Sequence, residues 1–426
     1  MQNIFKLSLL SLYLTFLSLT YPVLQMALRP LKTTEFVLLC SALISLTSFS
    51  IDGILPAFRQ IGQEFKLTDA TDTQYLISLF FFGMVFGELT VGAISDAFGR
   101  KKTLAGGLVV FCVGTIVAMT AGSMEMMLVG RFIQGIGVSS SKVVSRAVVR
   151  DLYEGEAMAR IMSFVMMTFI LVPMIAPAIG QVISNAFGWQ AIFLAYLSMA
   201  LGLMIWMGFR LPETLVKEKR LPLSGPVLWR NALAILSHRR VIACSVSSGL
   251  IFSGTLVYLS FAPIMFFEFY GIEDDFPLWF AILALPIGVS SFVNGKLVMR
   301  FGMYRLSMFG LLSLILVNAV FWAVAFAYDG VPPFWLFMSM FFASFGCIGL
   351  LFSNINTMAM QSLGRVAGLG SSLMFSLSSL VAVGASVFWG QFYDHTVGPI
   401  VLAYLFAGIV AMVLVFVANR SPVAPV

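Results

Sequence analysis

The chain has 426 residues, of which 60% are hydrophobic and only 10% are charged, and its mean hydropathy is +0.98. A soluble chain carries about 25% charged residues, so these values exclude an ordinary soluble protein. The net charge of +6 does not indicate nucleic-acid binding, because the cations lie in alternate connections, where membrane topology alone explains them.

The hydrophobic residues form continuous runs long enough to cross a bilayer, which takes about 20 residues each. Inside a bilayer the backbone must satisfy its own polar groups, which leaves helices or closed barrels. Barrel strands alternate polar and apolar residues in short segments, and these runs do not, so a β-barrel is excluded. We therefore predict an all-α polytopic membrane protein surrounded by a lipid bilayer.

The N-terminal extension, residues 1–30, leaves several interpretations open. Its apolar stretch Leu7–Leu28 fits a signal-like segment or an additional helix, and Met26 offers an alternative start of translation. An ordinary spanning helix with a cytoplasmic start would place the basic residues Arg100–Lys102 outside, against the charge rule. We therefore favour a dispensable extension or a start at Met26.

Twelve spans are expected in the rest of the chain, in two groups of six. The first group falls near Phe36–Phe58, Thr73–Ser95, Thr103–Ala121, Met124–Arg146, Met162–Ala186 and Gln190–Phe209. The second falls near Val241–Phe267, Pro277–Met299, Leu306–Tyr328, Pro333–Met358, Gly370–Gly390 and Pro399–Val417. The expected domains are an N-terminal six-helix bundle (31–211), a cytoplasmic linker (212–240), a C-terminal six-helix bundle (241–420) and a cytoplasmic tail (421–426).

The charges of the connections predict the orientation. Lys and Arg mark the cytoplasmic side of short loops, and their distribution places both termini in the cytoplasm. The connection between the eighth and ninth spans also repeats an earlier one: Gly295, Phe301, Gly302 and Arg305 align with Gly92, Phe98, Gly99 and Lys102. Two repeated six-span halves are typical of secondary transporters.

Four ionisable residues lie inside the predicted spans: Asp52, Glu88, Arg131 and Lys142. A charge at the centre of a span costs at least about 2.5 kcal/mol, so each is a functional candidate. Asp52 and Arg131 lie at similar depths, roughly 9–10 Å from the outer ends of their spans. They can neutralise each other or share a cavity in which Asp52 handles a proton; a static pair or a helix cap is the alternative.

Glu88 and Lys142 lie nearer the cytoplasmic ends of their spans. Glu88 either pairs with Lys142 or supports the following loop, and this structural interpretation is favoured. Glu88 nevertheless remains a candidate for proton coupling, together with Asp52 and Arg131.

The connection after the second span has the spacing Gly92-x-x-Ser95-Asp96-x-x-Gly99-Arg100-Lys101. A positive-inside loop would explain its cations alone. The whole spacing, however, resembles the loop between the second and third helices of the major facilitator superfamily and keeps every core position.

Two further stretches resemble motifs of the same family. Arg131-x-x-Gln134-Gly135-x-Gly137 resembles the fourth-helix motif of proton-coupled members, which implies that Arg131 takes part in proton transfer and that Gln134 packs or binds nearby. The segment Pro173–Gly180 resembles the antiporter motif incompletely, because Ala176 and Gln181 stand where glycines are expected.

Together with Ile51–Ala57, Arg150–Leu152 and Leu211–Thr214, these motifs resemble the Bcr/CflA drug-resistance branch. The resemblance implies a drug:proton antiporter of the bacterial inner membrane. It further implies that Asp52 and Arg131 belong to a proton-coupled cavity. The hinge of the cytoplasmic gate would consist of Gly92, Asp96, Gly99 and Arg100. The residues themselves indicate a helix stop at Leu211–Thr214.

The candidate substrate cavity contains uncharged polar residues: Gln134, Tyr258, Asn354 and Asn356. Because the intramembrane charges all lie in the first half, a neutral or cationic amphipathic substrate is expected. We expect a functional monomer with no nucleic-acid partner. No cysteine or histidine spacing fits a metal site, so no cofactor is expected beyond the proton gradient.

Proton-driven export of drugs is therefore the expected function, by alternating access of the two halves. The alternative is proton-coupled import or export of a specific metabolite, which the same fold permits. A membrane sensor or enzyme is disfavoured, because the sequence holds no recognisable catalytic constellation. An ATP-driven transporter is disfavoured by the lack of a phosphate-binding loop.

Overall fold

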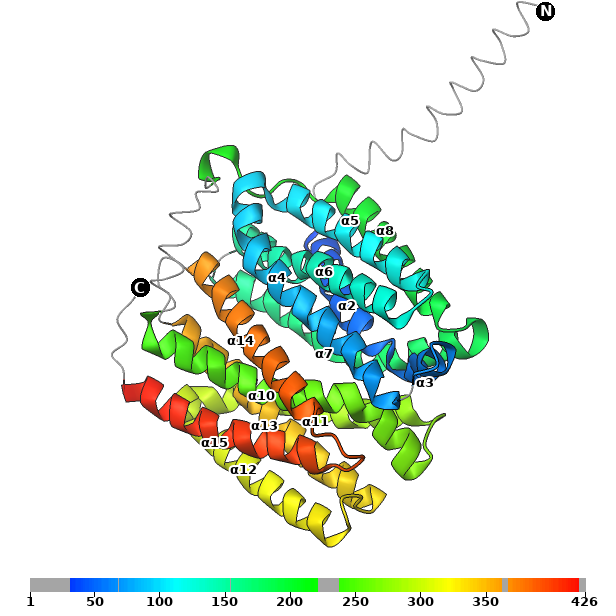
Figure 1. Ribbon diagram of the computed structural model, residues 1–426. Helices are drawn as coiled ribbons and strands as arrows, with labels where there is room; N and C mark the ends of the chain where they lie inside the picture. Colours follow the sequence, from blue (N-terminus) through cyan, green and yellow to red (C-terminus); the bar gives the residue numbers. More distant parts are fainter. Residues whose placement is uncertain (1–30, 68, 154, 221–236, 362–366, 421–426) are drawn as a thin grey trace, which may run out of the picture.

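The computed structural model describes residues 31–67, 69–153, 155–220, 237–361 and 367–420. Within these ranges the chain is helical and has no strand, and it contains twelve helices of 20 residues or more (Figure 1). Ten helices of the described ranges are long and apolar enough to cross a membrane. The predicted N-terminal extension, the tail and most of the linker lie outside the described residues.

The long helices form two bundles of six, as expected (Figure 1). The first bundle consists of α2 (Thr33–Asp52), α4 (Tyr75–Phe98), α5 (Arg100–Met119), α6 (Met124–Leu152), α7 (Gly155–Phe187) and α8 (Gln190–Arg210). The second consists of α10 (Arg239–Ile264), α11 (Phe276–Phe301), α12 (Met303–Ala327), α13 (Phe334–Met360), α14 (Ala367–Gly390) and α15 (Gly398–Arg420). The short elements are η1 (Leu55–Ala57), α3 (Phe58–Glu64), η2 (Ala70–Gln74), η3 (Lys217–Lys219) and the π-turn η4 (Met265–Phe269).

The first predicted span contains a break in its helix, although the helical segments together extend from Thr33 to Glu64. Helix α2 stops at Asp52, and Gly53 closes it by donating its N–H to the carbonyl of Phe49. Pro56 is the second residue of the 3-10 turn η1, where its missing N–H is tolerated. This break places Asp52 at the end of a helix and makes Phe58–Glu64 the separate helix α3.

Helices α6 and α7 are longer than predicted. Helix α6 has 29 residues, or about 43 Å at 1.5 Å per residue, which exceeds a hydrocarbon core of about 30 Å. Its last turn, with Arg150 and Asp151, therefore projects beyond the apolar layer.

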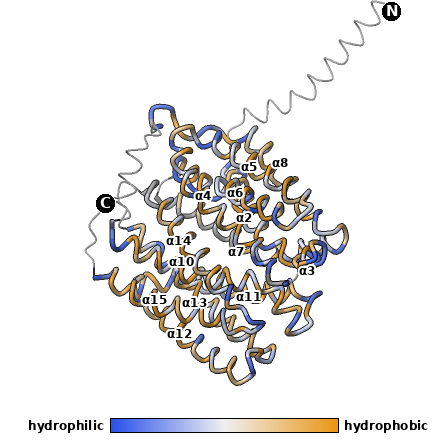
Figure 2. Tube along the Cα trace, viewed as in Figure 1, coloured by the Kyte–Doolittle hydropathy of each residue, from blue (hydrophilic) through white to orange (hydrophobic). Residues whose placement is uncertain are grey.

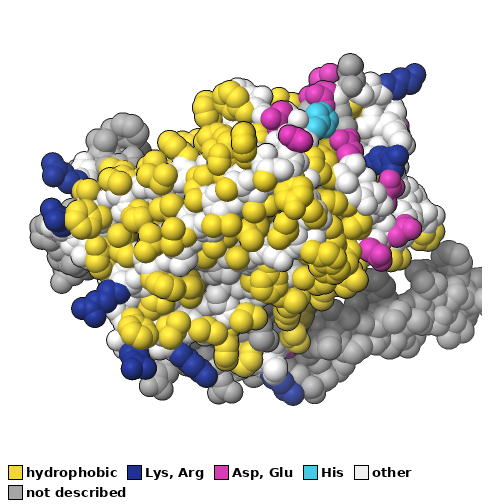
Figure 3. Space-filling model, turned by 90° about the horizontal axis from the view of Figure 1, so that it is seen from below, with side chains coloured by type: hydrophobic (Ala, Val, Ile, Leu, Met, Phe, Trp, Pro, Cys, Tyr) yellow, Lys and Arg dark blue, Asp and Glu magenta, His cyan; other side chains and the backbone are white. Residues whose placement is uncertain are grey.

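The two ends of the molecule differ in charge. Figure 2 shows hydrophobic helices with more polar segments toward their ends. Figure 3 shows a hydrophobic belt with cations at one end, and with acidic side chains, a histidine and further cations at the other. We call these the basic end and the acidic end. The basic end includes the α4–α5 and α11–α12 connections; the acidic end includes the η4–α11 and α14–α15 connections.

The predicted internal repeat is visible in the backbone at the basic end. Gly99 between α4 and α5 has φ +105°, and Gly302 between α11 and α12 has φ +78°. Both values lie in a region that glycine adopts at little cost, so both connections turn in a single residue. The repeat is incomplete in its side chains, because Met299 stands at the position of Asp96 and is 87% exposed.

The two bundles meet along two helix pairs, α4 with α14 and α7 with α11 (Figure 1). At the acidic end, Arg59 forms an ion pair with Glu273, and the Gln181 side chain donates to the Glu273 carbonyl at 2.9 Å. These contacts join the two bundles at the acidic end. The intramembrane charges lie between this end and the basic end.

Candidate functional site

Arg131 is fully buried in the first bundle and is held by three helices. Its Nε donates to the carbonyl of Leu76 at 3.1 Å, and its Nη1 donates to the carbonyl of Ser50 and to Oε1 of Gln134, each at 3.0 Å. The guanidinium carbon lies 4.2 Å from the centre of the Phe80 ring. These contacts with α2, α4 and α6 hold the cation in one orientation.

Gln134 extends this arrangement to a fourth helix. Its Nε2 donates to the Thr115 hydroxyl of α5 at 2.8 Å, while its Oε1 accepts from Arg131. The implied packing role of Gln134 is therefore present. Arg131 keeps one nitrogen, Nη2, sealed from water and without a hydrogen-bond partner in the structure. A buried charged donor without a partner is costly, so this atom is available to a group that enters the site.

Asp52 lies at the C-terminal end of α2 and is 4% exposed. It forms no ion pair with Arg131 in the described part of the chain, so the direct neutralisation considered from the sequence is absent. The Arg131 donors are directed instead at backbone carbonyls, including that of Ser50. Burial and the negative end of the α2 dipole both oppose an isolated negative charge at Asp52.

Two buried tyrosines lie in the electrostatic range of Asp52: Tyr196 of α8 and Tyr258 of α10. Neither hydroxyl has a hydrogen-bond partner. Tyr196 also interacts electrostatically with Arg131, so it lies near both charged residues. Tyr258 belongs to the second bundle, so this electrostatic interaction of Asp52 reaches from one bundle to the other.

Glu88 of α4 is fully buried and pairs with Lys142 of α6, with Nζ 2.5 Å from Oε1. The pairing considered from the sequence is therefore present. Glu88 also contacts the second bundle: Ser379 donates to its Oε2 at 3.1 Å, and Ser372 donates to its backbone carbonyl at 2.6 Å. No contact joins Glu88 to Asp52 in the described residues, so the two carboxylates occupy separate environments.

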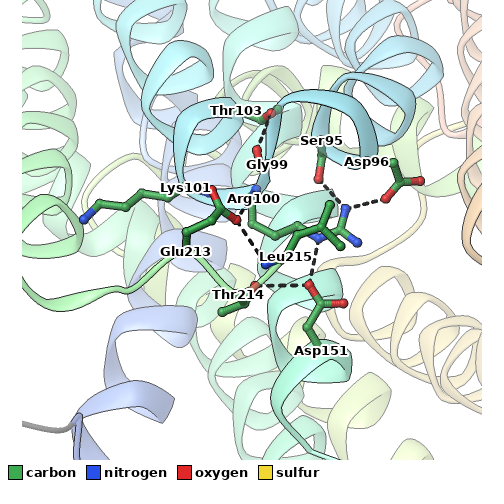
Figure 4. A network of polar contacts seen from close by, with 10 residues as sticks. All are labelled: Ser95, Asp96, Gly99, Arg100, Lys101, Thr103, Asp151, Glu213, Thr214 and Leu215. Atoms are coloured by element: carbon green, nitrogen blue, oxygen red, sulfur yellow. Dashed lines mark hydrogen bonds and ion pairs between the residues drawn. The ribbon is translucent and has the colours of Figure 1, made fainter. Parts of the chain in front are cut away.

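The predicted gate residues form a network around Arg100 at the basic end (Figure 4). Arg100 Nε lies 2.8 Å from Asp151 Oδ2, and its Nη1 lies 2.5 Å from Asp96 Oδ1 and 2.6 Å from the Ser95 hydroxyl. Asp151 comes from the end of α6; it belongs to the stretch Arg150–Leu152 that carried the resemblance, but it was not predicted as a gate residue. The network thus joins the α4–α5 connection to the end of a third helix.

Glu213 follows α8 within the predicted helix stop Leu211–Thr214, and its contact with α5 was not predicted. Its Oε1 accepts from the backbone N–H of Arg100 at 2.8 Å, and its Oε2 accepts from that of Lys101 at 3.3 Å (Figure 4). A carboxylate is favourable at a helix N-terminus, where N–H groups lack partners. The predicted helix stop is present, because α8 ends at Arg210, but the same segment also caps α5.

A signal for this cap does exist in the sequence. Helix α5 begins with Gly99 followed by Arg100, Lys101 and Lys102, and Gly99 provides no side-chain cap. Three cations at a helix N-terminus are electrostatically unfavourable without a nearby anion. The sequence alone indicates that an acid is needed, but it does not indicate which one.

Gly92 lies at the interface between the bundles. A Cβ built on Gly92 would lie 3.1 Å from the Ser372 hydroxyl of α14. A larger side chain at this position would therefore press on the second bundle, next to the Ser372 contact with Glu88.

The candidate cavity residues of the second bundle join neighbouring helices. Asn354 of α13 forms reciprocal side-chain hydrogen bonds with Asn294 of α11, at 2.7 and 3.2 Å. Asn356 accepts from the Ser248 hydroxyl of α10 at 3.0 Å. Tyr258 packs against Phe341 and Phe345. Each has a packing role, and its contact with a substrate stays a prediction.

The fold and these sites define a multi-pass membrane transporter built from two six-helix bundles. The sequence profile of the Major Facilitator Superfamily matches residues 37–375, so the chain belongs to this family.

Similarity to known drug-resistance proteins supports the resemblance to the drug-resistance branch. The chain is 28% identical to a bicyclomycin resistance protein homolog of Haemophilus influenzae, over 83% of this chain and 88% of the relative. It is 26% identical to the multidrug resistance protein MdtL of Escherichia coli, over 91% of this chain and 97% of MdtL. Among solved structures, the partially occluded inward-open xylose transporter XylE of E. coli has a TM-score of 0.72 at 16% identity, over 92% of this chain and 98% of XylE. That likeness confirms the fold.

Proposed function

We propose that this chain exports drugs or other small amphipathic molecules from a bacterial cell in exchange for protons. It would lie in the inner membrane with both termini in the cytoplasm and work as a monomer by alternating access of its two bundles. The family membership and the drug-resistance relatives support the export of such molecules. The single observation that supports the coupling is that Asp52 is buried at the end of α2 and forms no ion pair among the described residues.

In this proposal Asp52 is the group that carries the proton. Its electrostatic interactions with Tyr196 of the first bundle and Tyr258 of the second support this role, because movement of one bundle against the other would change its surroundings. A proton enters from the outside, binds Asp52 and leaves to the cytoplasm after the bundles have moved. A substrate then binds from the cytoplasm while Asp52 is unprotonated, and its exit is coupled to the next proton.

Arg131 supplies a fixed positive charge to this cycle. Because three helices hold its guanidinium, it cannot follow the proton or the substrate by changing orientation. A cationic substrate is attracted to the site only when Asp52 is ionised, since Arg131 otherwise repels it. Proton and substrate thereby exclude each other, which is what exchange requires.

Glu88 has a different role in the proposal. Its contacts with Ser372 and Ser379 hold the two bundles together at a level between Asp52 and the basic end. Lys142 balances its charge within the first bundle. The Arg100 network would form the hinge region next to this contact, with Glu213 fixing the start of α5.

The test uses inverted membrane vesicles that contain a pH-sensitive dye and are energised with a respiratory substrate. Each drug of an amphipathic panel is added, and the loss of the proton gradient is compared between wild type, Asp52→Asn and Asp52→Glu. Asp274→Asn is the matched control, because it removes an exposed carboxylate. We expect drugs to dissipate the gradient in wild type and the control, not in Asp52→Asn, and partly in Asp52→Glu.

Two outcomes contradict the proposal. Drug exchange that survives in Asp52→Asn places the proton site elsewhere. A panel without any effect, together with accumulation of radiolabelled solutes by whole cells, identifies an importer of a specific metabolite instead.

A further inference from the structure

Helix α11 exposes one continuous stripe over its whole length. The α11 stripe consists of Leu278, Leu285, Val289, Phe292, Lys296 and Met299. At about 100° per residue these positions fall within a sector of about 80°. The opposite side of the helix packs on α13, where Asn294 bonds Asn354. The stripe is therefore exposed on the side of α11 opposite α13, and Lys296 lies within it.

Lys296 is exposed and forms no ion pair among the described residues. Its Nζ lies 5.6 Å from the centre of the Phe292 ring, one turn closer to the middle of the membrane. Five residues separate it from the end of α11 at Phe301, which corresponds to about 7.5 Å of helix. A lysine at that depth extends its side chain toward the phosphate level.

Two further cations lie at the basic end of the stripe. Arg300 is exposed and lies 5.4 Å from the Phe301 ring centre, and Arg305 is exposed in the first turn of α12. Neither forms an ion pair in the described part of the chain. Three exposed cations, none of them paired with a carboxylate of the described residues, thus lie at the basic end of an exposed apolar stripe.

We propose that this surface binds one anionic phospholipid. Lys296 contacts the phosphate from within the membrane, and Arg300 and Arg305 contact the head group. The acyl chains lie along Leu285, Val289 and Phe292. Charge complementarity favours an anionic lipid, and the apolar stripe beside the cations favours a lipid over a free anion.

The position of this lipid matters because α11 is also a contact helix between the bundles. Helix α11 packs against α7 of the first bundle. A lipid held on α11 therefore lies next to helices that must move in any alternating-access cycle. This inference does not depend on the identity of the transported substrate or on the proton site.

The test incubates the purified protein in detergent with equal amounts of phosphatidylglycerol and phosphatidylcholine of different mass, and counts the retained lipids by native mass spectrometry. We expect wild type to retain phosphatidylglycerol preferentially. Each cation near a membrane surface contributes about 1 kcal/mol, so Lys296→Gln should lower this retention about fivefold. Lys296→Arg should keep the wild-type retention of phosphatidylglycerol.

The matched control is Arg420→Gln, which removes an exposed cation at the end of α15. Arg420 follows Phe416 by four residues, as Lys296 follows Phe292, and its guanidinium lies 4.4 Å from the Phe416 ring centre. Retention should be unchanged in this variant. An equal loss in Arg420→Gln, or unchanged retention in Lys296→Gln, overturns the proposal, and so does equal retention of both lipids by wild type.

A second measurement keeps the proposal testable if retention is low in detergent. Wild type and Lys296→Gln are reconstituted into vesicles of phosphatidylcholine alone or with added phosphatidylglycerol, and thermal unfolding is followed. The anionic lipid should raise the unfolding temperature of wild type and not that of the variant. An equal rise in both proteins overturns the proposal.

Discussion

The Arg131 guanidinium of α6 donates to the backbone carbonyl of Ser50 in α2 at 3.0 Å, and not to the carboxylate of Asp52, which follows two residues later. The cation is therefore fixed to the last turn of α2 without forming an ion pair with the Asp52 carboxylate among the described residues. This separation leaves the carboxylate able to exchange a proton or a cationic ligand, which a direct ion pair would oppose.

Replacement of Arg131 by lysine should disable transport although the charge is kept. A lysine cannot reproduce the planar set of donors to Ser50, Leu76 and Gln134, nor the stacking on Phe80. A hydrogen bond from a charged group contributes about 1.5–3 kcal/mol, so a loss of tenfold or more in the drug-dependent proton flux is expected. The vesicle assay measures this flux, with the exposed Arg239→Lys as control. Wild-type flux in Arg131→Lys would show that the guanidinium geometry is not required.

Removal of the Glu213 carboxylate should destabilise the start of α5. Glu213→Ala removes an acceptor shared by the N–H groups of Arg100 and Lys101, which typically costs about 0.5–2 kcal/mol at a helix N-terminus. Glu213→Gln keeps an acceptor and should lose less stability than Glu213→Ala. Thermal unfolding of the detergent-solubilised protein measures both variants. Glu218→Gln, an exposed acid in η3, should leave the unfolding temperature unchanged; an equal effect there would contradict the capping role.

Glu88 and Lys142 should behave as a coupled pair. Breaking a buried ion pair by removing one partner costs about 3–5 kcal/mol, because the other charge is left buried. Glu88→Gln and Lys142→Met should each destabilise the protein more than the double variant does. The free energy of unfolding of the four proteins gives the coupling energy. Additive effects would show that the 2.5 Å contact contributes nothing to stability.

The same double variant distinguishes the two roles considered for Glu88. If Glu88 carries the proton, the double variant loses drug-dependent proton flux while it stays folded. If Glu88 mainly holds the bundles together through Ser372 and Ser379, flux is kept at a changed rate. We expect the second result, since Lys142 already occupies one carboxylate oxygen and Ser379 the other.

Much of the fold follows from the sequence because hydrophobic run length and loop charge are local properties. The twelve long helices and the tight turns at Gly99 and Gly302 were predictable for that reason. The predicted first span continues to Phe58, whereas α2 ends at Asp52. Gly53 and Pro56 are both residues that can end a helix, but the length of the hydrophobic run does not indicate at which of them α2 ends.

The candidate site was predictable in its residue types and less so in its contacts. A buried charge is recognisable from its position in an apolar run, which identified Asp52, Glu88, Arg131 and Lys142. Partners depend on how helices distant in the sequence meet, so the contacts of Asp151 and Glu213 were not predicted. For Arg131, the sequence could not show that backbone carbonyls would serve as acceptors, because every residue offers one.

The contact between α4 and α6 provides the last prediction, because it supports the Arg131 site through its backbone. A Cβ on Gly135 would lie 2.0 Å from the Phe80 carbonyl, and one on Gly83 would lie 2.1 Å from the Phe132 carbonyl. Small residues let the two helices approach this closely. Gly135→Ala should therefore separate α4 from α6 and move Phe80 away from the Arg131 guanidinium.

We expect Gly135→Ala to lower the drug-dependent proton flux at least tenfold, because the site depends on the orientation of Arg131. Gly202→Ala in α8 is the matched control, since nothing lies within 4 Å of a Cβ at that position. Alanine is preferred over glycine inside a helix by about 0.5–1 kcal/mol, so the control should be as stable as wild type or more so. Equal flux in the two variants would show that the α4–α6 distance does not set the geometry of the site.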